Sequence, residues 1–487
     1  MLNSDSRLRF YRCCGWQSTA FLPRLRIFSS TMKDENKFLE LGERPVGSLL
    51  MQYAIPAIIA MTASSLYHII DAIFIGQGVG EEAIMGLALT GPVMSLTAAF
   101  GAMVGVGGST LMSVKLGQKD YETARDILGN VVIMNLIMGS SLGILLLMVI
   151  DPVLRFFGAS DYTIGPARDF MTVILSGNIV THLYLGLNSL LRSTNRPKQA
   201  MYATFGTVLL NCLLAPLFIF VFKWGIMGAG AATILAQVIM LVWEMHLFTS
   251  PDSPIRLESK RIRLKKKILK ESLTIGAPNF LINLCACTVA IFVTRSMTTY
   301  GGDIAVGAFG VVNRLALFVV MVVIGLNQGM QPIAGYNFGA RKFDRIMRVL
   351  KLSIIVATCI TTTGFIIGTF FSEFCVTPFA KDSPELIAAA AHGLRIQVMC
   401  FPLIGFQIVS TAFFQSIGYA GKSIFLSLTR QMLFLLPAIL ILPVFMDNKV
   451  DGVWFAMPLS DALATIVSVV MLWLQMKTFK SLQTVNN

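Results

Sequence analysis

An aspartate near the end of a long apolar run is the residue whose chemistry most needs an explanation. Asp71 belongs to the run LLMQYAIPAIIAMTASSLYHIIDAIFIG, which is long enough to cross a membrane. A carboxylate inside a spanning helix costs about 2.5–3.5 kcal/mol on insertion scales. An apolar site favours the neutral acid, whereas a bound cation favours the carboxylate. Asp71 is therefore a candidate to exchange a proton or a sodium ion. The alternative is a paired or hydrated side chain near the membrane surface.

Two neighbours of Asp71 can modify its behaviour. His68 precedes it by three residues and Tyr67 by four, so both lie near its face of a helix. His68 can share or tune a proton, and it can equally be a hydrogen-bonded interior histidine. Tyr67 can donate a hydrogen bond to the carboxylate.

A second acid, Asp461, lies well inside the last apolar run. Arg314 and Arg395 have similar expected depths in two other runs. Breaking a buried ion pair costs about 3–5 kcal/mol, so a buried acid and a buried arginine are expected to pair. We interpret these residues as candidates for a structural ion pair, with a direct functional role as the alternative.

These residues must be positioned by helices in a membrane. Of the 487 residues, 55% are hydrophobic and only 13% are charged, whereas a soluble chain carries roughly a quarter charged residues. The predicted fold class is an all-α polytopic membrane protein with twelve transmembrane helices. The expected spans are residues 48–76, 83–112, 127–150, 162–190, 200–222, 228–248, 271–299, 304–333, 349–371, 385–416, 423–445 and 452–476.

The basic residues predict the orientation of these spans. Thirty of the 39 Lys and Arg residues fall in the terminal segments and in loops on one side. The loops on the other side carry four, which are Arg155, Lys223, Lys381 and Lys449. By the positive-inside rule both termini are cytoplasmic. The net charge of +13 is therefore mainly a topology signal. The loop KRIRLKKKILK is expected to be solvated and able to touch anionic lipid.

The two halves of the chain resemble each other. The strings GGSTLMSVKLGQKDYETARD (107–126) and GMQPIAGYNFGARKFDRIMR (329–348) align at an offset of 222. Both place Gly-x-(Lys/Arg)-x-aromatic after a span, and LLRSTNRPKQAM likewise matches FQSIGYAGKSIF. Six spans is an even number, so the repeats are parallel. We predict an N-terminal segment 1–44, an N-lobe 45–249, a basic linker 250–270, a C-lobe 271–478 and a cytoplasmic tail 479–487.

Four strings together resemble the multidrug and toxic compound extrusion (MATE) family, in its MepA-like bacterial branch. They are YHIIDAIFIGQGVG, GLNQGMQPIAGYNFGARKFDRI, LTRQMLFLLP and GVWFAMPLSDALA, and the resemblance covers about residues 40–480. It implies two pseudo-symmetric six-helix lobes (the MATE/MOP-type fold) in the bacterial inner membrane. It also implies efflux of organic cations or other amphipathic compounds by alternating access, driven by inward flow of H⁺ or Na⁺. The resemblance implies no cofactor other than this coupling ion. The expected partners are small-molecule substrates and membrane lipid, and no nucleic acid. The chain is expected to be monomeric.

The resemblance carries over to the N-lobe site residue by residue. Asp71 matches the acid on the first helix, Asn211 an Asn on the fifth, and Thr233 a Thr on the sixth. Some members carry a second acid four residues after the Asn, where this chain has Ala215. Because a sodium cage would lose a charged ligand, we expect protons rather than Na⁺, carried by Asp71 alone. A sodium ion at Asp71 stays an alternative, and no other metal site is expected.

The C-lobe departs from another branch of the family. That branch has acids on its seventh and tenth helices, whereas this chain has APNFLINLCACTVA and PLIGFQIVSTAFF there. Gln407 is among the neutral polar groups that remain. A C-lobe cation site of that kind is therefore not expected.

Two functions other than an antiporter are compatible with a polytopic membrane protein. A lipid-linked oligosaccharide flippase of the same superfamily stays open because Arg314, Arg395 and Arg430 can line a cationic cavity. An enzyme is not expected, because HExxH, GxSxG and Walker motifs are absent and the four histidines are scattered.

The first 31 residues differ from the rest of the chain. The stretch RLRFYRCCGWQSTAFLPRLRIFSS is rich in Arg and Ser, with Asp5 as the sole acid in residues 1–31, as in transit peptides. The alternative, which we favour, is a start codon assigned too early. In that case Met32 opens the functional chain.

Overall fold

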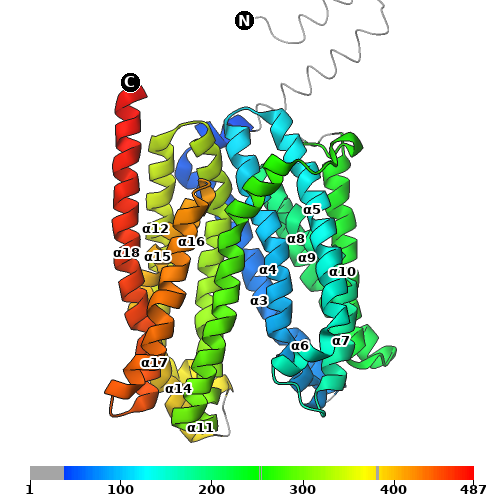
Figure 1. The fold of residues 1–487 in the computed structure, drawn as a ribbon, viewed down its shortest axis with the longest axis vertical. Helices are drawn as coiled ribbons and strands as arrows, with labels where there is room; N and C mark the ends of the chain where they lie inside the picture. The colour runs from blue at the N-terminus through cyan, green and yellow to red at the C-terminus, as the bar shows by residue number, and fades with distance from the viewer. Residues whose placement is uncertain (1–37, 80, 252, 254, 380–382, 487) are drawn as a thin grey trace, which may run out of the picture.

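The structure is a computed structural model that describes residues 38–79, 81–251, 253, 255–379 and 383–486. Helices make up nearly all of this part of the chain, and it contains no strands (Figure 1). In lipid every backbone polar group must find a partner within the protein, and a helix satisfies them along its own length. The all-α fold class expected from the apolar runs is confirmed. Residues 1–31, with the expected extension, lie outside the described residues.

After residue 45, the described part of the first half forms eight helices and one π-helical segment. They are α3 (Val46–Gly78), α4 (Glu81–Gly117), α5 (Tyr121–Met148), α6 (Ile150–Phe156), α7 (Ile164–Ser176), α8 (Asn178–Ser193), α9 (Pro197–Pro216), the π-helix η1 (Leu217–Val221) and α10 (Gly225–Thr249).

The second half begins with the linker and contains the remaining elements. They are η2 (Ser259–Arg261), α11 (Lys266–Gly339), α12 (Phe343–Phe370), α13 (Ser372–Val376), η3 (Thr377–Phe379), α14 (Pro384–Gln397), η4 (Val398–Cys400), α15 (Phe401–Ser416), α16 (Ala420–Leu428), the π-helix η5 (Thr429–Leu435), α17 (Leu436–Phe445) and α18 (Lys449–Asn486).

The described helices accommodate the twelve expected spans. Ten are long and apolar enough to cross a membrane, or eleven when α7 and α8, bent by 55°, count as one span. The 74 residues of α11 would extend about 110 Å as one straight helix. The chain instead reverses at Gly302, whose φ of 63° suits a residue without a side chain. Counting the two arms of α11 separately gives twelve.

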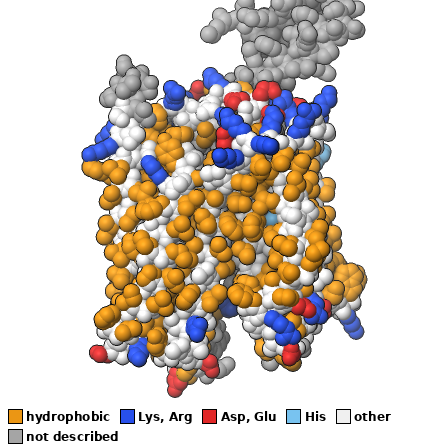
Figure 2. All heavy atoms as spheres, in the orientation of Figure 1, with side chains coloured by type: hydrophobic (Ala, Val, Ile, Leu, Met, Phe, Trp, Pro, Cys, Tyr) orange, Lys and Arg blue, Asp and Glu red, His pale blue; other side chains and the backbone are white. Residues whose placement is uncertain are grey.

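The helices form two lobes that diverge toward one end. In Figure 1, α3 to α10 form one lobe and α11 to α18 the other. On the face drawn in Figure 2, hydrophobic side chains form a broad band, with many Lys and Arg at its upper end and a notch between the lobes at its lower end. The upper end carries the α4–α5 and α8–α9 turns, the linker and the C-terminus. We call it the basic end.

Backbone geometry reproduces the internal repeat. Lys119 and Arg341, which are 222 residues apart, both adopt a left-handed conformation, with φ of 60° and 56°. In each turn the next backbone N–H reaches back five residues, from Asp120 to Lys115 O and from Lys342 to Asn337 O, at 2.9 Å each. This bond closes the helix end as a glycine-type C-cap would. The two predicted copies therefore fold alike at the level of single hydrogen bonds.

The lobes meet through glycines at the basic end. A Cβ at Gly117 of α4 would overlap the carbonyl oxygen of Tyr336 in α11, and one at Gly339 would overlap that of Val114. The two contacts are related by the same 222-residue spacing. A second reciprocal contact joins Gly276 to the Met103 carbonyl. Only the missing side chains let these backbones approach so closely.

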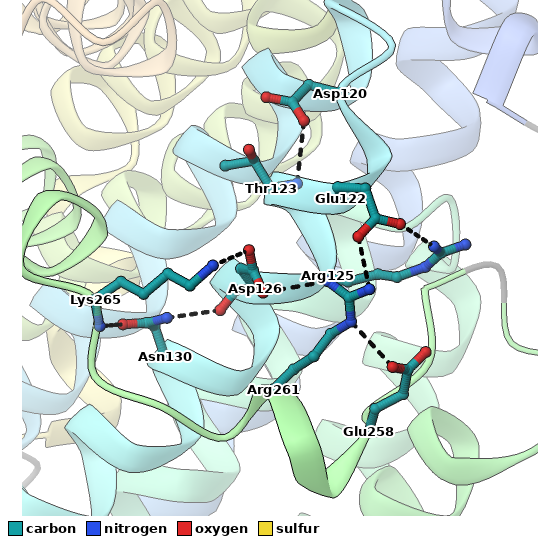
Figure 3. Close-up of polar contacts among 9 residues, drawn as sticks. All are labelled: Asp120, Glu122, Thr123, Arg125, Asp126, Asn130, Glu258, Arg261 and Lys265. Atoms are coloured by element: carbon teal, nitrogen blue, oxygen red, sulfur yellow. Dashed lines mark hydrogen bonds and ion pairs between the residues drawn. The ribbon is translucent and has the colours of Figure 1, made fainter.

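The linker is held on the N-lobe by charges (Figure 3). The Arg261 guanidinium pairs with Glu122 at 2.6 Å, Glu258 at 3.0 Å and Asp126 at 3.3 Å, and Lys265 also pairs with Asp126. Asn130 of α5 accepts a hydrogen bond from the backbone N–H of Lys265 at 2.7 Å. Hydrogen bonds to Glu122 and Glu258 raise the pKa of Arg261, so this clamp keeps its charge at any physiological pH.

Two expected boundaries differ from the structure. Helix α11 starts at Lys266, so the end of the predicted linker is helical and two of its basic residues are ion-paired instead of free in solvent. The predicted tail, 479–487, continues α18 as far as Asn486. No Gly or Pro follows residue 458 to end that helix.

Candidate functional site

Four of the predicted residues gather inside the N-lobe. Tyr67 and Asp71 lie on successive turns of α3, Asn211 on α9 and Thr233 on α10. The Asn211 amide donates hydrogen bonds to the Thr233 hydroxyl at 2.8 Å and to the Tyr67 hydroxyl at 3.1 Å, and these hydroxyls are 3.0 Å apart. Tyr67 also interacts with the Asp71 carboxylate. Three helices therefore bring their polar groups to one acid.

Two oxygens of this cluster are left without partners. Asp71 is only 7% exposed, and its Oδ1 has no hydrogen bond within the described part of the chain. The amide oxygen of Asn211 is likewise buried and unpartnered. Buried acceptors without donors are costly, so an incoming proton or cation would be stabilised here.

The other two N-lobe positions contribute no polar group that the structure describes. His68 lies in α3, and its side chain is outside the described residues. Ala215 lies one turn beyond Asn211 and is completely buried in an apolar cluster with Ile75 and Phe218. The site is thus built around a single described carboxylate.

The C-lobe contains a buried ion pair whose basic partner differs from those expected. Arg430 Nε donates to Asp461 Oδ1 at 2.6 Å, and Asp461 is 3% exposed. The expected partners lie elsewhere, since Arg395 bonds Ser372 and Glu373 and Arg314 is exposed on α11. Arg430 belongs to the π-helix η5, which packs against α18, the helix that carries Asp461.

The fourth C-lobe candidate, Gln407, is buried in α15. Its carbonyl oxygen has no hydrogen-bond partner among the described residues. It does not join the Arg430–Asp461 pair, so the structure does not gather the predicted C-lobe residues into one site.

Comparison with known proteins finds one family in both lobes of the fold. A family model described as MatE matches residues 56–217 and again residues 278–440. The chain belongs to the MatE family. The two matches begin at the same spacing as the repeated motifs, as two copies of one six-helix unit require.

Relatives and solved structures agree with MatE membership. The chain is 25% identical over 411 residues to the multidrug export protein MepA of Staphylococcus haemolyticus, covering 84% of this chain and 90% of the relative. It is 24% identical to MepA of Staphylococcus aureus strain MSSA476, covering 91% and 97%. A structure of the outward-facing conformation of a multidrug resistance MATE family transporter of the MOP superfamily superimposes with a TM-score of 0.86, at 24% identity over 91% of this chain and 98% of that one. The predicted fold and family are confirmed, and MatE proteins are transporters rather than enzymes.

Sequence reasoning missed one buried acid in this MatE chain. Glu244 of α10 is 0% exposed, and its Oε1 accepts a hydrogen bond from the Asn188 amide at 3.0 Å. The side-chain oxygen of Asn188, Oδ1, accepts one from the Arg192 guanidinium at 2.7 Å. Glu244 is the one Asp, Glu, Lys or Arg residue in the apolar stretch LVWEMHLF, and this isolation could have identified it. Its position near the end of the span is also compatible with a residue at the membrane surface.

Breaking the Arg430–Asp461 pair should destabilise this MatE protein. Asp461→Asn leaves the mostly buried Arg430 uncompensated, which costs about 3–5 kcal/mol. We expect a lower midpoint of thermal unfolding in detergent. Adding Arg430→Met to Asp461→Asn removes the orphaned charge and should recover much of the loss. A midpoint for the single variant equal to that of the parent protein would show that the pair contributes nothing.

Proposed function

We propose that this protein is a proton-driven exporter of organic cations or other amphipathic small molecules in a bacterial cytoplasmic membrane. The observation that carries the proposal is the buried cluster of Asp71, Tyr67, Asn211 and Thr233. It sits in one lobe of a two-lobed fold whose relatives bear the name multidrug export protein. One chain contains both lobes and the whole cluster, so we expect a monomer to carry out transport.

The orientation follows from the charges. With the basic end in the cytoplasm, as the positive-inside rule requires, the lobes are closed inside and separated outside. The structure then represents an outward-facing state. Rocking of the lobes would separate their glycine contacts, open the basic end and close the other.

Asp71 can couple this motion to a proton. The neutral acid is favoured when the site is dry, and the carboxylate when water or a cationic substrate reaches it. Protonation from the outside would displace a bound cation. Release of the proton to the inside would restore the charge that attracts the next one. The unpartnered Oδ1 is the natural atom to hold this proton.

The donor set favours H⁺ over Na⁺. Hard cations take about six or more oxygen ligands in proteins, and the cluster has two unpartnered oxygens, on Asp71 and Asn211, within the described residues. The Tyr67 and Thr233 hydroxyls already accept hydrogen bonds from the Asn211 amide. Ala215 supplies no oxygen where a second carboxylate would stand. One carboxylate is enough for a proton.

A pH gradient should therefore drive export without sodium. Inside-out vesicles in sodium-free buffer should accumulate a fluorescent organic cation when their interior is acidified. A sodium gradient at uniform pH should not drive this accumulation. Ala215→Asp places a second carboxylate one turn from Asn211 and should introduce sodium sensitivity. A strict sodium requirement in the unmodified protein would overturn proton coupling and mean that further ligands complete a cage.

A flippase for lipid-linked sugars is less well supported. Its cationic cavity would need arginines free to bind pyrophosphate, but Arg430 is paired with Asp461 and Arg395 with Glu373. Arg314 is exposed and does not pair with Asp461 or Glu373. One guanidinium alone is a weak basis for binding a pyrophosphate.

A further inference from the structure

Glu244 is a buried acid with no role in the scheme above. It lies in α10 on the basic-end side of the N-lobe, completely buried, and its Oε2 is unpartnered in the described part of the chain. No Lys, Arg or His nitrogen among the described residues lies within ion-pair distance of it. Arg192 acts on it only across Asn188. Such a carboxyl in a membrane helix is expensive and marks a functional site by default.

A line of polar side chains connects Glu244 to the Asp71 cluster. On α10, Thr233, Gln237 and Glu244 are spaced by four and seven residues, which places them on one helix face. Gln237 accepts a hydrogen bond from Thr181 of α8 at 2.6 Å. One turn further along α8, the Tyr184 hydroxyl interacts with Thr204 and Thr207 of α9 and acts electrostatically on Glu244.

The distance along this line is too long for a direct transfer. Eleven residues separate Thr233 from Glu244, or about 16 Å of helix. Hydroxyls and amides of α8, α9 and α10 occupy the interval, and such groups are the polar partners that a chain of water molecules would need. We call this line, made of Thr181, Gln237, Tyr184, Thr204 and Thr207, the polar track.

The charged and titratable groups around Glu244 suit a site that changes its protonation. Tyr184 and Arg192 of α8 act on it electrostatically, and Asn188 of α8 donates a hydrogen bond to it. Arg196 caps the end of α10 through the Leu247 carbonyl at 3.0 Å, and His246 is exposed on α10 itself. Arg192 bonds the Asn188 side chain and not the Glu244 carboxylate, so its charge acts on Glu244 without a direct ion pair among the described residues.

We propose that Glu244 is a second proton-binding site of the N-lobe, which receives the proton released by Asp71 through the polar track and passes it to the basic end. The Asp71 carboxyl loses H⁺ and becomes a carboxylate, and the Glu244 carboxylate gains H⁺ at Oε2. Glu244 then returns this H⁺ to water at the basic end. The inference rests on the proposed proton coupling and adds its inward exit.

Glu244→Gln keeps the size and the hydrogen bond from Asn188 but cannot carry a proton. In inside-out vesicles its export driven by a pH gradient should fall by about tenfold or more, as for loss of a positioned proton carrier. Exchange of dye between equal pools at uniform pH needs no net proton movement and should stay unchanged. Infrared difference spectra between acid and neutral pH should lose one protonated-carboxyl band. Glu271→Gln, at the start of α11 in the other lobe, is the matched control and should behave like the parent.

Glu244→Asp guards against a failure of the Gln variant to fold. It retains a carboxyl with shorter reach, so it should show part of the export and a shifted infrared band. The inference is overturned if the parent exports with a pH gradient and Glu244→Gln does so at the same rate, or if its infrared bands are unchanged. It is also overturned if Glu244→Asp leaves the band in place. A parent protein that ignores the pH gradient would instead refute proton coupling itself.

Discussion

Asp71→Asn is expected to abolish export against a gradient while leaving the protein folded in the membrane. The amide keeps the shape of the side chain and can still interact with Tyr67. It cannot release and rebind a proton, so the cycle loses its only link to the driving gradient at this site. An amide also avoids the cost of burying a charge, so the free energy of unfolding should not fall.

The measurement is accumulation of a fluorescent cation in inside-out vesicles with an imposed pH gradient. The ratio of dye inside to outside should fall to one in Asp71→Asn, although dye still equilibrates slowly. Asp169→Asn is the matched control, because Asp169 is an exposed acid on α7 of the same lobe, and it should accumulate dye normally. A variant that still concentrates dye at the parent rate would remove Asp71 from the mechanism.

Gly117→Ala is expected to prevent the lobes from closing at the basic end. The added Cβ would overlap the Tyr336 carbonyl oxygen, which belongs to a helix backbone and cannot rotate away. Overpacking a close contact costs about 1–3 kcal/mol, and 1.4 kcal/mol is a factor of about ten in a conformational equilibrium. The ratio of outward-facing to other states should therefore fall by about fivefold or more, and export with it.

Distances between spin labels at Asp161 and Asn448, on the lower ends of the two lobes, can follow this equilibrium. Gly117→Ala should shift their distribution toward shorter values. Gly421→Ala serves as the control, since a Cβ there meets no atom within 4 Å. Its distance distribution should match that of the parent. An unchanged distribution in Gly117→Ala would mean that the glycine contact does not govern closure.

Local patterns in the sequence determined much of this protein. Long apolar runs predict the spans because a bilayer sets their length, and the distribution of Lys and Arg predicts their orientation. The repeated Gly-x-(Lys/Arg)-x-aromatic motif predicts two like halves, because the same turn follows the same helix. Asp71 stood out because few charges are tolerated in such runs.

Side-chain partners were decided only by the tertiary structure. Asp461 pairs with Arg430 of η5, whereas Arg395 pairs with Glu373 and Arg314 is exposed on α11. Glu244 is completely buried, and its hydrogen bond from Asn188 of α8 is a contact that no local pattern in the sequence identifies. Membrane helices are apolar on every side, so periodicity does not reveal which face is turned inward. That rotation, and with it the partner of each buried charge, depends on how neighbouring helices pack.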